Sequence, residues 1–210
     1  MRNLLLPAMT AMTLVGATLA SIACDASPTY DVTPKTQPAT IDPKEPQETA
    51  ILAGGCFWGM ENVMRKAPGV LKIEVGYAGG ARTDVKYEDV ETGKTGHAES
   101  VRIVFDPQKI SYEDLLKHFY FRGHDPTSLD RQNNDVGPQY RSEIFTTSKA
   151  QADTAARVIA EVTKTGKWGK PIVTKVEAAS TFVLAEDYHQ DYLIKHPNGY
   201  NDHYLRDFDF

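Results

Sequence analysis

The sequence is poor in cysteine. Its 210 residues include only two cysteines, Cys24 and Cys56. Two thiols cannot form a disulfide-stapled framework, a four-cysteine zinc site or an iron–sulfur cluster. Those classes of protein are therefore excluded, and the question becomes what each thiol does.

The chain also lacks an excess of positive charge. It has 23 Lys and Arg against 28 Asp and Glu, which gives a formal net charge of −5 at pH 7. Proteins that hold nucleic acid through phosphate contacts carry the opposite balance. We therefore expect no nucleic-acid partner.

A long uninterrupted apolar run is missing too, although the amino terminus comes close to one. In residues 1–24 Arg2 is the only charge, and threonine and glycine interrupt the apolar stretch that follows it. This stretch is marginal as a membrane-spanning helix and fits a secretory signal peptide, residues 1–23, better. Cleavage can follow Ala20 or Ala23.

Cys24 directly follows Ala23, which resembles a bacterial lipoprotein site, although Ser21 stands where Leu is usual. We expect Cys24 to be lipidated and to anchor the chain in a membrane. Plain secretion and an uncleaved anchor are the alternatives. All three place the protein outside the cytoplasm, as a periplasmic protein or membrane-anchored lipoprotein, or else as a secreted one.

Residues 24–48 are predicted to form a tether rich in proline and threonine. Residues 25–48 contain five of the twelve prolines and few large apolar side chains. Such a composition cannot bury enough surface to fold, so an extended and solvated segment is expected.

From residue 49 to 210 the hydrophobic patterns alternate between strand and helix, which predicts one folded domain. Strands are expected at 50–53, 70–75, 98–105, 143–145 and 172–178, and helices at 57–67, 112–121 and 148–163. The first strand, the first helix and the second strand form a strand–helix–strand unit. The fold class is α/β or α+β: a two-layer α/β sandwich with a mixed sheet and a long irregular C-terminal tail after Phe182.

Cys56 lies between Gly54-Gly55 and a predicted helix. Unpaired N–H groups and the helix dipole at this place favour a thiolate, so we expect the thiol pKa to fall below about 8.5. The two glycines allow a ligand to approach the backbone closely. A buried, inert cysteine is the alternative.

Four segments carry a resemblance to a known family. Residues 55–61 (GCFWGME), 96–99 (GHAE), 135–142 (DVGPQYRS) and 185–192 (AEDYHQDY) are similar, in order and spacing, to segments of the A-type peptide methionine sulfoxide reductases. The match spans about residues 49–195. It implies an enzyme that reduces methionine sulfoxide, of the S epimer, in oxidised proteins and as the free amino acid.

The resemblance also implies a role for individual residues. Cys56 is then the nucleophile that attacks the sulfoxide sulfur, and Glu99 is the acid that protonates the oxygen. That acid must be partly buried, so that its pKa rises from about 4.3 toward neutrality. A surface glutamate on a strand is the alternative for Glu99.

Tyr87 and Tyr140 align with family tyrosines that donate hydrogen bonds to the sulfoxide oxygen. Asp135 matches a family residue that orders water or holds the site together. For the tyrosines a packing role is the alternative, and for Asp135 a role in the turn before Gly137.

Phe57 and Trp58 follow the nucleophile and would form an apolar cage for the substrate's methyl group, or else the first core residues of a helix. Glu61 is expected to act through helix-terminus electrostatics. His97 and His189 are expected to be structural. Neither has further metal-ligating residues at the spacing that a zinc site needs.

The chain departs from the family in having no cysteine after Cys56, where many members carry resolving cysteines. A sulfenic acid on Cys56 must then react with an external thiol, from a thioredoxin-like protein or a small molecule, or with Cys24. We expect no bound cofactor, a one-cysteine cycle and a monomer.

Two other functions remain open at this stage. One is a thiol hydrolase that uses Cys56 with His97 or His189 as the base. The other is a tethered redox sensor without turnover. The first predicts loss of activity on replacing a histidine, and the second predicts stoichiometric oxidation only.

Overall fold

The computed structural model describes residue 30 and residues 46–210. The predicted signal peptide, Cys24 and most of the tether lie outside the described residues and stay predictions. Within the described part of the chain, no helix has both the length and the apolar composition to cross a membrane.

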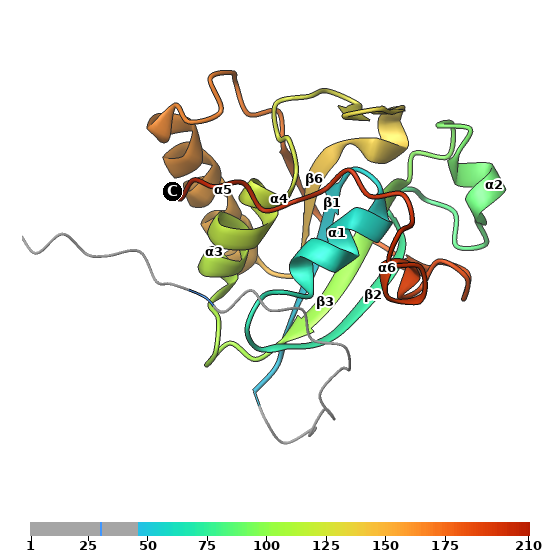
Figure 1. Ribbon diagram of the computed structural model, residues 1–210, viewed down its shortest axis with the longest axis horizontal. Coiled ribbons are helices and arrows are strands. Elements are labelled where there is room, and N and C mark those ends of the chain that lie inside the picture. The colour runs from blue at the N-terminus through green and yellow to red at the C-terminus, as the bar shows by residue number, and fades with distance from the viewer. Residues whose placement is uncertain (1–29, 31–45) are drawn as a thin grey trace, which may run out of the picture.

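One six-stranded sheet organises the domain, in the order β7-β6-β1-β3-β2-β8 (Figure 1). Its strands are β1 (Glu48–Gly54), β2 (Val70–Ala78), β3 (Ala98–Phe105), β6 (Ser142–Thr146), β7 (Lys175–Ala178) and β8 (Val183–Leu184). Strands β6 and β7 pair in parallel and the other pairs are antiparallel, so the sheet is mixed, as expected. A small hairpin, β4 (Arg131–Gln132) and β5 (Asp135–Val136), lies apart from it.

The strand–helix–strand unit is split by a third strand. β3 lies between β1 and β2 and pairs antiparallel with both. In the β1–β3 pair, Ala53 faces Ser100. The end of β1 that leads into Cys56 therefore lies beside the start of β3.

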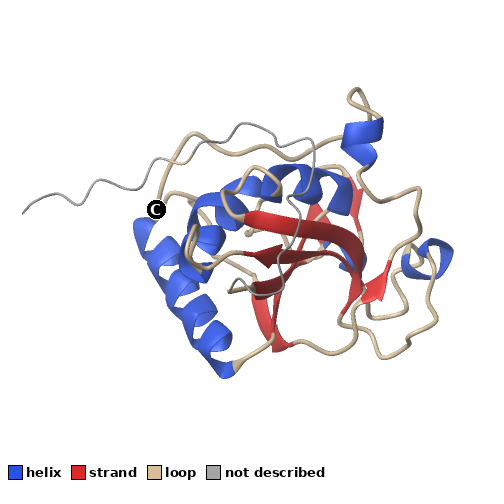
Figure 2. Ribbon diagram, turned by 90° about the horizontal axis from the view of Figure 1, so that it is seen from below, coloured by secondary structure: helices blue, strands red, loops and turns tan. Residues whose placement is uncertain are grey.

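The helices cover one face of this sheet, which makes the two layers (Figure 2). They are α1 (Phe57–Met64), a continuous helical segment of α3 (Tyr112–Asp114), η1 (Leu115–Tyr120) and α4 (Phe121–Gly123), and α5 (Lys149–Thr165). The middle turn, η1, is a π-helix, which no hydrophobic period distinguishes from an α-helix. Short helical turns α2 (Tyr87–Val90), η2 (Pro138–Tyr140) and α6 (Tyr192–Lys195) lie in the connections.

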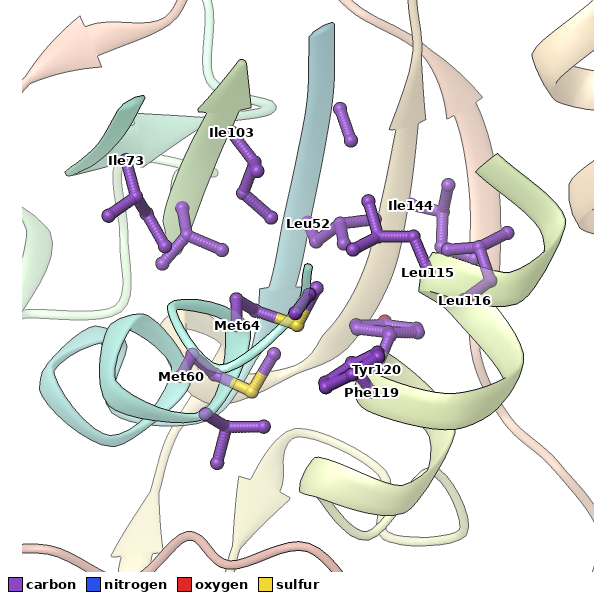
Figure 3. Close-up of a cluster of buried hydrophobic side chains, with 14 of the residues drawn as sticks. Leu52, Met60, Met64, Ile73, Ile103, Leu115, Leu116, Phe119, Tyr120 and Ile144 are labelled. Carbon is purple, nitrogen blue, oxygen red and sulfur yellow. The ribbon is translucent and has the colours of Figure 1, made fainter. Parts of the chain in front are cut away.

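The core lies between the sheet and these helices. Alternate residues of β1 point to opposite faces, so that Leu52 joins the main core while Ile51 packs on the other side. Figure 3 shows Leu52 beside Met64 of α1 and Leu115 of η1. All of these side chains except Ile51 are fully buried, so the main core anchors both β1 and α1.

Several helices and strands begin or end at other residues than predicted. The first helix ends at Met64 rather than at residue 67, and β7 begins at Lys175 rather than at residue 172. The helix expected at 148–163 runs from Lys149 to Thr165, where Gly166 ends it with a left-handed φ of 64°.

The tail after Phe182 is irregular except for β8 and α6. It is fastened to the sheet by Gln190, whose side chain accepts the N–H of Val75 at 3.0 Å and donates to the carbonyl of the same residue at 2.9 Å. At the other end of the chain, Tyr30 of the predicted tether packs its ring 5.4 Å from His118 and 5.6 Å from Phe119.

Candidate active site

Cys56 lies in the turn that joins β1 to α1. It is the N-cap residue of α1, and its carbonyl accepts the N–H of Met60 at 3.2 Å. Its side chain is 7% exposed. The thiol therefore sits at a helix start, as the sequence predicts, but in a nearly dry environment.

The two glycines before Cys56 serve protein packing. A Cβ on Gly55, whose φ is 102°, would lie 2.4 Å from the side chain of Gln132. A Cβ on Gly54 would lie 2.9 Å from the ring of His124. The expectation that these glycines admit a ligand is therefore wrong, because buried side chains of the protein fill the space beside them.

Glu99 reaches the start of α1 from β3. The β1–β3 register puts it one residue beyond the pair Ala53–Ser100, next to the turn. Its carboxylate accepts the backbone N–H of Phe57 at 3.0 Å. The Trp58 N–H donates to the sulfur of Cys56. Two otherwise unpaired donors of the helix thus go to the thiol and the carboxyl.

Glu99 is an acid that holds its proton at neutral pH. Burial raises its pKa to about 8, and the negative charges of Asp135 and Asp202 act in the same direction. The N–H of Phe57 opposes the shift without cancelling it. The buried carboxyl that the sequence predicts is present.

The thiol of Cys56 differs from the prediction. Burial raises its pKa well above the usual value, and the charge of Glu99 adds to the rise. The Trp58 N–H lowers it, as expected for a helix start, but burial outweighs that effect. The thiolate form of Cys56 is therefore disfavoured in the free site. Forming it costs less free energy when Glu99 is protonated and neutral.

A cavity of about 260 Å³ opens beside the sulfur. Every residue predicted from the sequence as catalytic or substrate-binding lines it, and Tyr200 joins them. The lining residues are Cys56, Phe57, Trp58, Glu99, Tyr87, Tyr140, Asp135 and Tyr200.

An aromatic wall forms one side of this cavity. The ring of Trp58 stacks on Tyr192 of α6, with centroids 3.7 Å apart and an angle of 12°. Its Nε1–H donates to His189 Nδ1 at 3.1 Å. Phe57 is 1% exposed, so it belongs to the core as well as to the cavity. The core interpretation of Phe57 is therefore confirmed, and the methyl cage stays a prediction for two residues that line the cavity.

The two predicted tyrosines come from separate turns. Tyr87 begins α2, and its backbone N–H donates to Glu186 Oε1 at 2.9 Å. Tyr140 ends η2. Burial raises the pKa of Tyr87 to about 12 and also raises the pKa of Tyr140. Both hydroxyls stay protonated and can donate hydrogen bonds into the cavity.

Asp135 faces the cavity from β5. The hydroxyl of Tyr200 donates to its Oδ2 at 3.2 Å. Burial and the charge of Asp202 raise the pKa of Asp135. The aspartate therefore has a partner across the cavity mouth and is not merely a turn residue.

Comparison with known proteins identifies the family. Residues 48–208 match the model of the family described as peptide methionine sulfoxide reductase. The chain belongs to this family. It is 50% identical over 166 residues to the peptide methionine sulfoxide reductase MsrA of Deinococcus radiodurans, covering 79% of this chain and 80% of that one.

Solved structures agree with this membership. Mxr1 from Saccharomyces cerevisiae in its reduced form is 38% identical with a TM-score of 0.74, covering 84% of this chain and 99% of that one. Mxr1 in complex with Trx2 is 29% identical with a TM-score of 0.53, covering 82% of this chain and all of that one, 100%. The chain is thus a methionine sulfoxide reductase with the mixed α+β fold of its relatives.

Neither histidine considered as a base lines the cavity of this reductase. His97 is buried against Gly80, and its Nε2 lies 3.1 Å from the carbonyl of Arg82. His189 accepts from Trp58, and burial lowers the pKa of both rings. Both are neutral structural residues, which removes the geometric basis for a Cys–His hydrolase.

Glu61 acts differently from the prediction. It is 2% exposed and pairs with Arg65 at 2.8 Å, while Arg65 also bonds to Asp191 at 2.5 Å. This cluster ties α1 of the reductase to the segment that carries Tyr192. Its role is to join two elements, and not to balance a helix dipole.

Sequence reasoning gave no role to two contributors, Tyr200 and Glu186. Glu186 lies within the family-like segment 185–192, which is a signal for it, whereas no pattern in the tail marks Tyr200. Glu186 also accepts the hydroxyl of Tyr77 at 2.9 Å, so it links Tyr87 to the sheet. In the described residues, no group of three or more His, Cys, Asp or Glu could hold a metal ion.

Proposed function

We propose that Cys56 reduces methionine sulfoxide by attacking its sulfur, with Glu99 as the proton donor. As the Cys56 sulfur bonds to the sulfoxide sulfur, the thiol passes its proton to the carboxyl, and the carboxyl gives its own proton to the sulfoxide oxygen. The hydroxyl group then moves to the Cys56 sulfur, so that the S–O bond of the substrate and the bond between the two sulfur atoms both break. The products are methionine and Cys56 sulfenic acid, so the substrate sulfur gains two electrons and Cys56 loses two. The observation that carries this proposal is that Glu99 is buried and lines one cavity with the thiol, and burial raises its pKa to about 8.

Tyr87 and Tyr140 hold the sulfoxide oxygen through their hydroxyl groups. Both remain neutral donors because their pKa values lie far above neutral pH. Such preorganised donors stabilise the negative charge that develops on oxygen in a site with little water. Asp135, held by Tyr200, orders the mouth of the cavity.

Phe57 and Trp58 receive the substrate's methyl group. A thioether or sulfoxide methyl packs favourably against aromatic rings, and Trp58 is held rigidly between Tyr192 and His189. With the oxygen at the tyrosines and the methyl at the aromatic wall, the chain of the substrate must leave through the mouth. That arrangement selects one sulfoxide epimer, which we propose is the S epimer, in peptides and in free methionine.

An external thiol returns Cys56 to its reduced form. The first thiol condenses with the sulfenic acid to a mixed disulfide and water, and a second thiol releases Cys56 by forming a disulfide. Cys56 is free and buried, and it is the only cysteine among the described residues. A relative was solved in complex with Trx2, which supports a thioredoxin-like donor; small thiols are the second source.

The deciding experiment is turnover on both sulfoxide epimers, with Cys56→Ser and Glu99→Gln beside the unchanged enzyme. We expect the S epimer alone to be reduced, no turnover by Cys56→Ser, and a large loss in Glu99→Gln. Stoichiometric oxidation without turnover under excess dithiol would instead identify a redox sensor.

The one-cysteine cycle has its own test. The full chain receives one equivalent of substrate without reductant, and mass spectrometry then locates the oxidised sulfur. We expect a trappable sulfenic acid on Cys56. A Cys24–Cys56 disulfide would show instead that Cys24 is the resolving thiol.

We further propose that the enzyme works outside the cytoplasm, held by a lipid on Cys24. The support is the sequence pattern of residues 1–24. Expression of the full chain in a bacterium, followed by fractionation and mass spectrometry of the mature amino terminus, tests this. We expect a lipidated Cys24 in the membrane fraction, and Cys24→Ser should release the enzyme; a mature chain beginning at Ser21 would contradict it.

A further inference from the structure

Two side chains that the proposed reaction does not use hold the carbonyl of Gly54. His203 Nε2 lies 2.7 Å from this oxygen, and Gln132 Nε2 donates to it at 3.2 Å. Gln132 belongs to β4, whereas His203 belongs to the C-terminal segment, which we define as residues 199–210. Two distant parts of the chain thus meet at the end of β1, two residues before Cys56.

The ring of His203 fills a slot that only glycines leave open. A Cβ on Gly59 would lie 2.3 Å from His203 Nδ1, and a Cβ on Gly55 would lie 3.0 Å from Cε1. The side chain of His203 is 0% exposed. It is wedged between the turn before Cys56 and the first turn of α1, so any shift of the ring moves the turn.

Asp202 precedes His203 in the chain, and its carboxylate lies close to the ring. Its Oδ1 lies 2.6 Å from His203 Nδ1, and its side chain is 8% exposed. This contact does not have the geometry of a hydrogen bond, since neither the carboxylate oxygens of Asp202 nor His203 Nδ1 has a hydrogen-bond partner in the described part of the protein. The ring nitrogen that does have a partner is Nε2, which lies 2.7 Å from the Gly54 carbonyl oxygen.

The C-terminal segment is fixed on both sides of the pair. Asn133 Nδ2 donates to the carbonyl of Asp202 at 2.9 Å. Further on, the N–H of Arg206 donates to the carbonyl of Arg122 at 3.1 Å, and Arg122 Nη2 donates back to Arg206 at 2.7 Å. Figure 1 shows this segment running past α1 toward α4. The backbone that carries His203 is therefore held on both sides of this residue.

We propose that His203 is a positioning residue for the nucleophile. It locks the Gly54 carbonyl and hence the direction in which the Cys56 sulfur enters the cavity. It does not line the cavity, so it does not touch substrate. The inference rests on the proposed reductase reaction, since its effect is a rate of attack by Cys56. A C-terminal segment without a thiol thus still serves the active site.

The first experiment compares His203→Ala with Asp207→Ala, a control at an exposed position of the same segment. A misplacement near 1 Å costs about 100-fold in rate, so we expect kcat of His203→Ala to fall about 100-fold. KM should stay within about two-fold, because the cavity lining is intact. The side-chain amide of His203→Gln can donate to the Gly54 carbonyl. This variant should keep at least about a tenth of the kcat of the unchanged enzyme.

A second experiment reads the position of the sulfur without the reductase reaction. The rate of Cys56 alkylation by iodoacetamide should change in His203→Ala and stay unchanged in Asp207→Ala. Circular dichroism measures the folded fraction of each variant, and all rates are divided by it. The positioning proposal would be overturned if the kcat of His203→Ala stays within two-fold of the unchanged enzyme, or if His203→Gln recovers no activity. The proposed function would be overturned if the unchanged enzyme itself shows no turnover.

Gly59→Ala supplies an independent route to the same displacement. The added methyl should push against His203 and reduce kcat in the unchanged background. In the His203→Ala background the ring is gone and only Asn201 Oδ1, 2.9 Å from the added methyl, stays close, so the same methyl should cost less than in the unchanged background. Equal losses in both backgrounds would mean that the Gly59→Ala methyl lowers kcat without acting through His203. That result would contradict the role given to the packed His203 ring.

Discussion

The carboxylate of Glu99 accepts the backbone N–H of Phe57, the residue next to the nucleophile, at 3.0 Å. This bond joins the start of β3 to the start of α1. It places the carboxyl that we propose as the proton donor beside the turn of the thiol, although 42 positions separate Glu99 from Phe57 in the chain.

Glu99→Gln should lower kcat/KM by about 10²- to 10⁴-fold, the usual contribution of general acid catalysis. The amide keeps an oxygen that can accept the Phe57 N–H, so the fold should survive. Steady-state kinetics with dithiothreitol and a thermal melt check both parts. A variant that melts normally and turns over at the wild-type rate would remove Glu99 from the mechanism.

The pH profile should depend on the same group. The folded pKa of about 8 lies above the ordinary value of 4.5, so the acid form prevails at pH 7. We expect kcat/KM to fall as pH rises above about 8. The profile is measured between pH 6 and 10 for the unchanged enzyme and for Glu99→Gln, in which this limb should be absent.

Stability should follow the same titration. Between pH 4.5 and 8 the folded state keeps a proton on Glu99 that the unfolded chain has released. The stabilisation is fully present below pH 4.5 and disappears as pH rises through 8. The melting temperature of Glu99→Gln relative to the unchanged enzyme should therefore increase over this range, and a constant difference would contradict the raised pKa.

Tyr192→Ala should weaken substrate binding. Its ring stacks on Trp58 at 3.7 Å, and such a pair contributes about 0.5–1.5 kcal/mol. We expect KM to rise up to about ten-fold with a smaller change in kcat. Ile194→Ala, on the same short helix and 40% exposed, is the matched control. Equal effects of the two substitutions would point to α6 as a whole.

Arg65→Ala should destabilise the fold in a pH-dependent way. The substitution leaves Glu61 buried without its cation, at a cost of about 3–5 kcal/mol when Glu61 is charged. Because burial already raises the pKa of Glu61 to about 7, the carboxyl can protonate at lower pH and reduce the penalty. Urea unfolding should show a larger loss at pH 8 than at pH 5.5. Arg65→Ala with Glu61→Gln should be more stable than Arg65→Ala alone at pH 8.

Local features could be predicted from the sequence because they depend on neighbours along the chain. Alternation in residues 98–105 predicts β3, and Ser148 and Gly166 delimit α5 because a cap and a left-handed residue are local requirements. The place of Cys56 at a helix start follows in the same way. Three of the four family-like segments contain cavity residues, whereas Tyr87 and Tyr200 of the cavity lie outside all four.

What no local pattern determines is which segments meet. The insertion of β3 between β1 and β2 brings Glu99 to Cys56, and long-range packing of the tail brings Tyr200 and His203 to the same turn. Neither position carries a hydrophobic period.

The thiol of Cys56 shows the division most clearly. The sequence alone predicts that Cys56 lies at the start of a helix. That feature by itself predicts a lowered thiol pKa. Burial, which depends on everything packed over the turn, raises the pKa instead. The sequence by itself determined which residue is the thiol and on which turn it lies. Only the tertiary structure decided its charge, because desolvation is a property of the surroundings.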